Sequence, residues 1–250
     1  MVIDDRIAER RAEVRDQRRR ARLRRTLVVV SLVGLVAVLM AVERSALVAL
    51  EEVAVEGADR LEAAEVRAAA DLELGTSILR LRLGEARERV ERLPLVRSAD
   101  ARRADPLTVV VTVTEREPAL AVTDGEADRL IDRDGVVVLD GRLEGLPVIE
   151  VEQPLPPVGE SVEGHAALAN AHRAWRGLSG PIRGEVVRYD AVSADELELE
   201  LADGVRVRFG RAQRVDEKVR ALGAVLADVG DADVAVIDVR APGAPVVVGP

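Results

Sequence analysis

Few side chains in this 250-residue sequence could carry chemistry, and their spacing does not favour catalysis. Cysteine is absent, which excludes disulfides, thiol catalysis and thiolate metal sites. The two histidines, His165 and His172, lie seven residues apart, so both could face one side of a helix. Two neutral imidazoles without a carboxylate cluster make a poor metal site. We therefore expect two incidental histidines on a helix surface.

Neither the acidic runs nor the serines indicate a metal site or a catalytic site. Calcium could be ligated by Asp132 and Asp134, or by Asp228, Asp231 and Asp233. However, neither run has the EF-hand pattern, and aspartates that form turns explain both. The serines lack the glycine elbow of a serine hydrolase, and their spacing supports no Ser-His-Asp set. We expect no catalytic residue, no metal, no cofactor and no small-molecule substrate.

The overall composition excludes a further class of partner. The 36 basic residues face 45 acidic ones, giving a net charge of −9, whereas nucleic-acid-binding domains are usually basic. One Trp, one Tyr and one Phe leave almost no surface on which bases could stack. We therefore expect no nucleic-acid partner.

A basic tail and an apolar segment open the chain. Residues 1–25 carry ten arginines and five acids, a charge of +5 that leaves −14 for the other 225 residues. Residues 26–42 then contain no charge over 17 positions. As an α-helix they would span about 25 Å, slightly less than a ~30 Å hydrocarbon core, and Arg24 and Arg25 can snorkel at the end.

Three interpretations compete for this apolar segment. A buried core helix would be unusual directly after ten arginines, and residues 39–44 offer no clear site for cleavage of a signal peptide. An uncleaved anchor fits best, with the arginines on the cytoplasmic side. We expect a basic cytoplasmic tail (1–25), a single transmembrane helix (26–42) in the cytoplasmic membrane, and extracytoplasmic domains that fold without disulfides.

Residues 43–118 predict a small α+β unit of order β-α-α-β-β. Asp59 is a candidate N-cap for the first helix, Pro94 ends the second, and Pro118 closes the unit. We expect two helices packed on one face of a three-stranded sheet. The expected elements are 51–56, 62–70, 84–93, 95–102 and 107–115.

Residues 119–241 predict a second α+β unit that is rich in strands and holds two helices. A Pro-rich loop at 153–160 interrupts its sheet, and we expect the Pro/Gly-rich tail, 242–250, to be flexible. Short apolar runs between Gly and Asp turns predict the strands, and apolar spacing along one face predicts the helices. The expected strands are 119–122, 129–131, 136–139, 147–151, 183–189, 196–201, 205–209 and 234–239, and the expected helices are 165–178 and 212–228.

Several short motifs follow one another in a fixed order over about residues 20–240. They are V-x-V-x-G at Val53, Val55 and Gly57; G-x-x-I-L at Gly75, Ile78 and Leu79; LPLVRSA at Leu93–Ala99, then Arg102, Arg103 and Pro106; Glu115, Arg116, Pro118 and Ala119; Ile131, Asp132 and Gly135; Leu146-Pro147; Gly210; and IDVR at Ile237–Arg240. In this order and spacing they resemble the FtsQ/DivIB family of bacterial cell division proteins.

The resemblance implies a fold and a role. The first unit would be a POTRA domain and the second the family's β domain, in a non-enzymatic scaffold that recruits other division proteins to the septum. The final strand of the β domain would bind an FtsB/FtsL-like coiled-coil pair by strand addition at an exposed sheet edge. Family members place aromatic residues near the LP stretch and the last strand, where this chain has Leu95 and the aliphatic run VAVIDV.

Carried over by position, the resemblance also assigns candidate interaction residues. A charged neighbour, Arg211, follows the Gly210 turn, and Arg102, Arg103 and Arg116 form either a POTRA contact surface or only a solvated strand face. The final strand would equally suit a buried core strand. The partner-binding residues would be Val234, Ala235, Val236, Ile237, Asp238, Val239 and Arg240, together with Arg211.

Other functions would need features that the sequence does not offer. An anchored cell-wall hydrolase needs a nucleophile or metal constellation. A translocation component of the Omp85 kind needs repeated POTRA units and a long barrel, yet fewer than 135 residues follow Pro118. Another membrane-anchored, POTRA-bearing binding or sensor protein, unconnected with division, stays open as the alternative.

Overall fold

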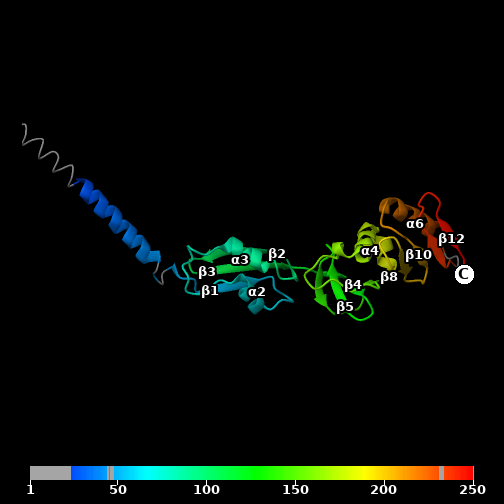
Figure 1. Ribbon diagram of the computed structural model, residues 1–250, viewed down its shortest axis with the longest axis horizontal. Helices are drawn as coiled ribbons and strands as arrows, with labels where there is room; N and C mark the ends of the chain where they lie inside the picture. Colours follow the sequence, from blue (N-terminus) through cyan, green and yellow to red (C-terminus); the bar gives the residue numbers. More distant parts are fainter. Residues whose placement is uncertain (1–23, 44, 46–47, 231–233, 250) are drawn as a thin grey trace, which may run out of the picture.

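A computed structural model of the chain describes residues 24–43, 45, 48–230 and 234–249. One helix and two folded domains follow each other along an extended molecule (Figure 1). The predicted basic tail lies outside the described residues, except for Arg24 and Arg25, which are in the N-terminal helix.

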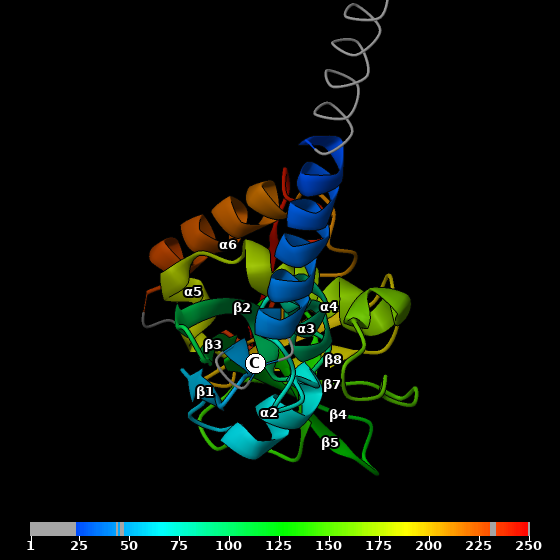
Figure 2. The same cartoon turned by 90° about the vertical axis from the view of Figure 1, so that its left-hand side faces the viewer.

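The N-terminal helix, Arg24–Glu43, has the properties of a membrane span. The helix has 20 residues, its 18-residue apolar window has a mean hydropathy of 2.5, and none of that window is buried inside the protein. At 1.5 Å per residue it is about 30 Å long, enough to cross a hydrocarbon core. The lack of burial excludes the core-helix interpretation. Figure 2 shows the helix projecting in front of the domains and joined to them only at its C-terminal end.

The first domain has the predicted β-α-α-β-β order. Its sheet runs β1-β3-β2, with β1 parallel and β2 antiparallel to the central strand. A single core fills the space between the sheet and the two helices, which contact each other. The elements are β1 (Glu52–Glu56), α2 (Ala63–Ala70), α3 (Leu83–Val90), β2 (Val96–Asp105) and β3 (Thr108–Glu115).

Local sequence explains these elements well. Every second residue of the central strand packs in the core, as Val109, Val111 and Val113 do. The helix α3 contributes Ala86 and Val90, which are four residues apart and so lie on one face. The Asp59 N-cap prediction is wrong, because α2 begins later, after Glu62, and no side chain caps it.

The second domain holds one mixed, nine-stranded sheet in the order β12-β11-β10-β9-β8-β7-β4-β5-β6. Of its neighbouring strand pairs, five are antiparallel and three are parallel, namely β4 with β7, β7 with β8, and β10 with β11. The strands are β4 (Pro118–Thr123), β5 (Asp128–Asp132), β6 (Val137–Asp140), β7 (Val148–Glu150), β8 (Val186–Ala191), β9 (Leu197–Leu201), β10 (Arg206–Arg208), β11 (Val236–Asp238) and β12 (Val246–Val248).

Helices α4 (Ala166–Gly177) and α6 (Val215–Val229) contact each other above this sheet and enclose the main core with it (Figure 1). A short 3-10 turn, η2 (Val162–Gly164), precedes α4. A third helix, α5 (Gly180–Glu185), was not predicted. It occupies the place where the sequence predicts a strand from residue 183, and Pro181 in its first turn is the start signal that was missed.

A small interface joins the two domains. Leu95 from the first domain is 5% exposed and packs with Leu130 and Val138 of the second. Beside it the Arg116 guanidinium donates to a carboxylate oxygen of Asp132 at 2.6 Å. The arginine side chain is 19% exposed and the aspartate 3%, so Arg116 belongs to the domain junction and not to an exposed POTRA surface.

The expectation of a flexible tail over 242–250 is wrong for its middle part. Residues 246–248 form β12, which pairs antiparallel with β11 and places Val247 opposite Ile237. The chain reverses through residues 239–245, where the Ala244 N–H donates to the Ala241 carbonyl at 3.0 Å. The sheet therefore ends one strand later than the sequence predicts.

Candidate protein-interaction site

The predicted binding strand is not a free edge in this structure. β11 pairs with β10 on one side and with β12 on the other, so its central residue, Ile237, lies between Val207 and Val247. Ile237 is 1% exposed, and Val236 and Val239 are also buried. The buried-strand interpretation therefore holds for the core of Val234–Val239, and its role in partner binding stays a prediction.

The outer strand at this end of the sheet is β12 instead. Within the described part of the chain, no strand pairs with its outer side. Its three residues, Val246, Val247 and Val248, are 55%, 43% and 49% exposed, and none is charged. Soluble proteins usually protect such edges with charges, prolines or covering loops. We call Val246–Val248 the C-terminal edge, and its backbone and apolar side chains suit the addition of a strand from another chain.

An arginine and an aspartate stabilise the turn that brings this edge back onto the sheet. The Asp238 carboxylate accepts from the Arg240 backbone N–H at 3.0 Å and from its guanidinium at 2.6 Å. The guanidinium bonds hold the pKa of the Asp238 carboxyl below its usual range, and the carboxylate raises the pKa of Arg240 in return. Both side chains therefore stay charged.

Buried polar side chains hold the neighbouring turn, which carries Arg211. The Lys218 ammonium donates to the carbonyls of Phe209 and Arg211 at 2.7 and 2.8 Å, and burial lowers the pKa of this lysine. Asn170 accepts from the Ala212 N–H at 2.6 Å. Buried side chains thus hold the backbone of the turn in place, whereas the Arg211 side chain points outward and pairs with an exposed carboxylate, Asp195.

A charged cleft lies between this turn and Arg240. Its volume is about 320 Å³, and its walls carry Glu198, Arg208 and Arg240 around the glycine at position 210. Arg208 pairs with Glu198 at 3.2 Å across its floor. Carboxylates and guanidiniums side by side suit the charged side chains of a peptide. The structure thus brings Arg211 and Arg240 to one end of the second domain, beside β11 and β12.

The three POTRA arginines do not form one surface. Arg102 is exposed and 3.9 Å from Glu56, Arg103 donates to the Ile78 carbonyl at 2.9 Å, and Arg116 is in the domain junction. They lie in a different domain from the C-terminal edge. The ion pair of Arg102 with Glu56 is long and lies at the surface.

His172 also differs from its prediction. It is 2% exposed, stacks on Trp175 with ring centroids 5.7 Å apart, and lies 3.2 Å from the Arg133 carbonyl through its Nε2 atom. Burial lowers the pKa of this imidazole. His165 caps the start of α4, where its Nδ1 accepts from the Leu168 N–H at 3.2 Å. The two histidines therefore have structural roles, and only His165 is near the helix surface.

Sequence reasoning missed the valines of the C-terminal edge. Three consecutive valines show no alternation, and prolines and glycines precede and follow them, so the pattern predicts a tail. The run of β-branched residues was the one available signal of a strand.

Comparisons with known proteins match both domains. The description "POTRA domain, FtsQ-type" fits residues 48–116, and "Cell division protein FtsQ/DivIB, C-terminal" fits residues 119–240. Together the two matches cover most of the chain. The chain belongs to the FtsQ/DivIB family. The second match ends at residue 240, so β12 lies outside the matched residues.

Relatives named cell division protein FtsQ agree with this family. The chain is similar to cell division protein FtsQ of Mycobacteroides abscessus, 30% identical over 82% of this chain and 65% of that protein. It is also 30% identical to FtsQ of Streptomyces coelicolor, over 73% of this chain and 72% of that protein. The match to Mycobacterium leprae FtsQ covers 51% of that protein. The chain thus spans one half to three quarters of these relatives.

Proposed function

We propose that this protein is a non-enzymatic, single-pass scaffold of the cell division machinery. The N-terminal helix anchors it in the cytoplasmic membrane, and its POTRA and β domains recruit and link septal proteins outside the cytoplasm. Membership of a family of cell division proteins supports a role in division, and the exposed, uncharged C-terminal edge supports binding of a partner by strand addition.

The orientation follows from charge. Ten arginines precede the apolar helix within residues 1–25, whereas the chain beyond it carries −14. Basic residues next to a span are retained on the cytoplasmic side. The two acidic domains would then lie outside the cytoplasm, where the septum is built.

The observation that carries the mode of action is the C-terminal edge. An added strand would satisfy the outer N–H and C=O groups of β12 and cover its three exposed valines. The charged cleft beside Arg240 would then select charged side chains of the same partner. We propose an FtsB/FtsL-like pair as this partner, on the resemblance described above. The earlier candidate strand, β11, would support the edge from within.

Affinity capture from membranes of the source organism tests this proposal. Full-length protein is compared with the double variant Val246→Lys, Val248→Lys, whose two positions lie on one face of the strand. Charges on an edge strand oppose strand addition, so we expect capture of division proteins to fall at least about ten-fold, equivalent to ~1.4 kcal/mol of binding free energy. A proline at Ile237 in β11 would not distinguish loss of the binding site from loss of the fold, because Ile237 is buried and its strand is paired on both sides.

The matched control is the double variant Val187→Lys, Val192→Lys, which changes two exposed valines elsewhere on the same domain. It should capture partners as the wild type does and support septation when it is the only copy in the cell. Equal capture by both double variants would show that the edge is not the binding site. Normal septation in cells that lack the protein would instead favour the binding or sensor alternative.

A further inference from the structure

Two leucines on one loop of the POTRA domain are unusually exposed. The α2–α3 loop, residues 71–82, carries Leu74 at 65% and Leu79 at 67% exposure. Among the described residues of the two folded domains, no other large apolar side chain is as exposed. Both leucines are therefore available to an apolar environment outside the domain.

The same loop is tied to the chain that leaves the N-terminal helix. The Leu50 N–H donates to the Thr76 carbonyl, and the Leu50 carbonyl accepts from the Gly75 N–H, each at 2.8 Å. The Ile78 N–H likewise donates to the Val48 carbonyl at 2.8 Å. These bonds place the loop at the end of the domain where the chain enters from the helix.

A direct ion pair connects the loop to the helix itself. The Arg80 guanidinium contacts the carboxylate of Glu43, the last residue of the helix. Glu43 is also the first charged residue after the 17 uncharged positions of the apolar segment, so it lies at the membrane surface when that segment spans the bilayer. Arg80 must then be at the same level, and the Cα atom of Leu79 is about 3.8 Å from that of Arg80.

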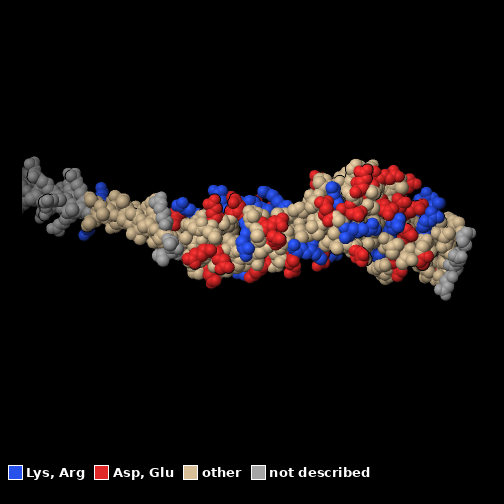
Figure 3. All heavy atoms as spheres, turned by 90° about the horizontal axis from the view of Figure 1, so that it is seen from below, with Lys and Arg blue, Asp and Glu red and all other residues tan. Residues whose placement is uncertain are grey.

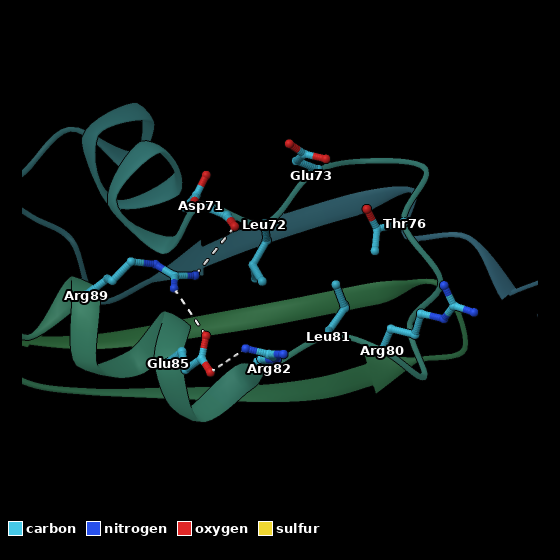
Figure 4. A pocket seen from close by; sticks show the side chains of 9 residues that line it. All are labelled: Asp71, Leu72, Glu73, Thr76, Arg80, Leu81, Arg82, Glu85 and Arg89. Atoms are coloured by element: carbon cyan, nitrogen blue, oxygen red, sulfur yellow. Dashed lines mark hydrogen bonds and ion pairs between the residues drawn. The ribbon is translucent and has the colours of Figure 1, made fainter.

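Anchors on its inner side keep the loop from folding its leucines inward. Ile78, next to Leu79, is 5% exposed and packs in the domain core, and its carbonyl accepts from Arg103 at 2.9 Å. Gly75 has a φ of +85°, a left-handed conformation that turns the chain directly after Leu74. Figure 4 shows the pocket on the loop's inner side, with Thr76 and Arg80 at one end and Asp71 and Arg89 at the other.

We propose that the α2–α3 loop is a membrane contact, in which Leu74 and Leu79 enter the headgroup region of the leaflet from which the N-terminal helix emerges. The occupant of this surface is lipid, because the ion pair to Glu43 holds the loop at the bilayer surface. Leu74 and Leu79 match the apolar residues that proteins bury about 5–10 Å deep at a membrane interface, whereas the neighbouring Arg80 suits the headgroup level. This inference rests on the proposed membrane span.

The contact would fix how the molecule stands on the membrane. A single helix leaves the domains free to tilt, whereas a helix and a loop that touch the bilayer at separate points define an orientation. Because the domains follow each other in a row (Figure 1), the C-terminal edge would then be held far from the membrane, at the other end of the molecule.

Site-specific fluorescence on the full chain in vesicles of phosphatidylethanolamine and phosphatidylglycerol tests the inference. The sequence has no cysteine, so the variants Leu74→Cys and Leu79→Cys each take one environment-sensitive label. Leu39→Cys, in the helix, reports on the span, and Leu143→Cys, an exposed leucine of the second domain, is the matched control. Lipids with a nitroxide near the headgroup and aqueous iodide serve as the two quenchers.

We expect lipid nitroxide to quench the labels at positions 74 and 79 at least about three-fold more than at 143, because an interfacial residue lies within several Å of the headgroups. Iodide should show the opposite order. Adding Leu79→Glu should reduce lipid quenching of the label at 74, whereas adding Leu143→Glu should not. This pair of results would show that insertion depends on the leucine at 79 and is not caused by the label.

Two results would overturn the inference, and they are distinguishable. Iodide-accessible labels at 74 and 79, together with a lipid-quenched label at 39, would leave the span intact and assign the leucines to a protein partner. An iodide-accessible label at 39 would refute the span, and with it both the anchored scaffold and the membrane contact.

Discussion

Glu115, at the end of β3, accepts hydrogen bonds from three consecutive backbone N–H groups, those of Asp59, Arg60 and Leu61, at 2.9 to 3.1 Å. This carboxylate, and not an Asp59 cap, shapes the loop that leads into α2. The loop also brings Leu61 toward the domain junction, where it packs beside Leu95. One carboxylate therefore supports both the first domain and its contact with the second.

Replacing Glu115 with alanine should lower the free energy of unfolding by about 1–2 kcal/mol, since three N–H groups lose a charged acceptor that is partly exposed to water. Urea denaturation of the fragment 48–250 measures this change. Glu117→Ala removes the same charge two residues away, from an exposed side chain. Equal losses in the two variants would mean that charge alone, and not the set of bonds, is responsible.

His172 makes stability depend on pH. Its pKa is lowered by burial in the folded state, so the unfolded chain binds the proton first as pH falls through the ordinary histidine value of about 6.5. Stability is therefore complete above that value and is lost as pH falls toward the folded pKa, by about 1.4 kcal/mol for each unit of depression.

Denaturation of the same fragment between about pH 7.5 and pH 5.5 should show this loss, and His172→Gln should reduce the slope even if it costs stability at every pH. Arg173→Gln, on the exposed side of the same helix, should leave the slope unchanged. An unaltered slope in His172→Gln would assign the pH dependence to other groups.

At the scale of elements, α6 is held against the sheet by Lys218, the one lysine of the chain, which is 5% exposed. Lys218→Met keeps much of the side-chain volume but leaves the carbonyls of Phe209 and Arg211 without their donor. We expect unfolding free energy to fall by about 2 kcal/mol and amide exchange in the 209–212 turn to accelerate. Arg220→Met, on the exposed face of α6, should change neither quantity.

A turn that exchanges as slowly in Lys218→Met as in the wild type would contradict this assignment. In that case the Asn170 contacts alone would hold the turn. The double change of Lys218 and Asn170 would then be needed to release Arg211 from its present position.

Elements with strong periodicity could be predicted from the sequence, and those that depend on tertiary contacts could not. Valines alternate along β3, and Ala86 and Val90 repeat along α3, so local pattern decides both elements. Helix α5 was missed because the sequence pair Gly180-Pro181 usually indicates a turn or loop, and nothing local shows that a helix begins there. The strand β12 was missed because its three valines become a strand only by pairing with β11, after a turn that sequence alone does not indicate.

In the candidate site, too, the position of residues along the chain could be predicted, whereas their tertiary contacts could not. Motif order located Arg211 and Arg240 near the last predicted strand, and the structure brings both to that end of the second domain, while their role in binding stays a prediction. It could not show that β11 has a further neighbour, nor that Arg116 pairs with Asp132 across the domain junction. Charged side chains look alike in sequence whether they face solvent or a buried carboxylate.

At the scale of the whole molecule, charge and shape separate three regions. Figure 3 shows an uncharged surface along the N-terminal helix and charges of both signs across the two domains. The junction between the domains rests on Leu95 and on the Arg116 pair, which is 2.6 Å long and mostly buried. Breaking a buried pair leaves one charge without a partner and is costly.

Removing Arg116 should therefore loosen the junction. Spin labels at Glu88→Cys and Arg142→Cys, one on each domain, should give a narrow distance distribution. Arg116→Ala should broaden it, because Asp132 loses its guanidinium partner and keeps only its bonds from the N–H groups of Asp134 and Val136. Arg92→Ala, an exposed residue of the first domain, is the control and should leave the distribution narrow. An equally narrow distribution in Arg116→Ala would show that the apolar contacts alone fix the two domains.

The proposed function depends most on the C-terminal edge as the place where another division protein binds. Photocrosslinking in dividing cells tests this directly, with a photoreactive phenylalanine analogue in place of Val247 and, as the control, in place of Val187, which has nearly the same exposure. We predict that position 247 forms a covalent product with another division protein and that position 187 does not. Products at 187 alone, or none at 247, would contradict strand addition at this edge.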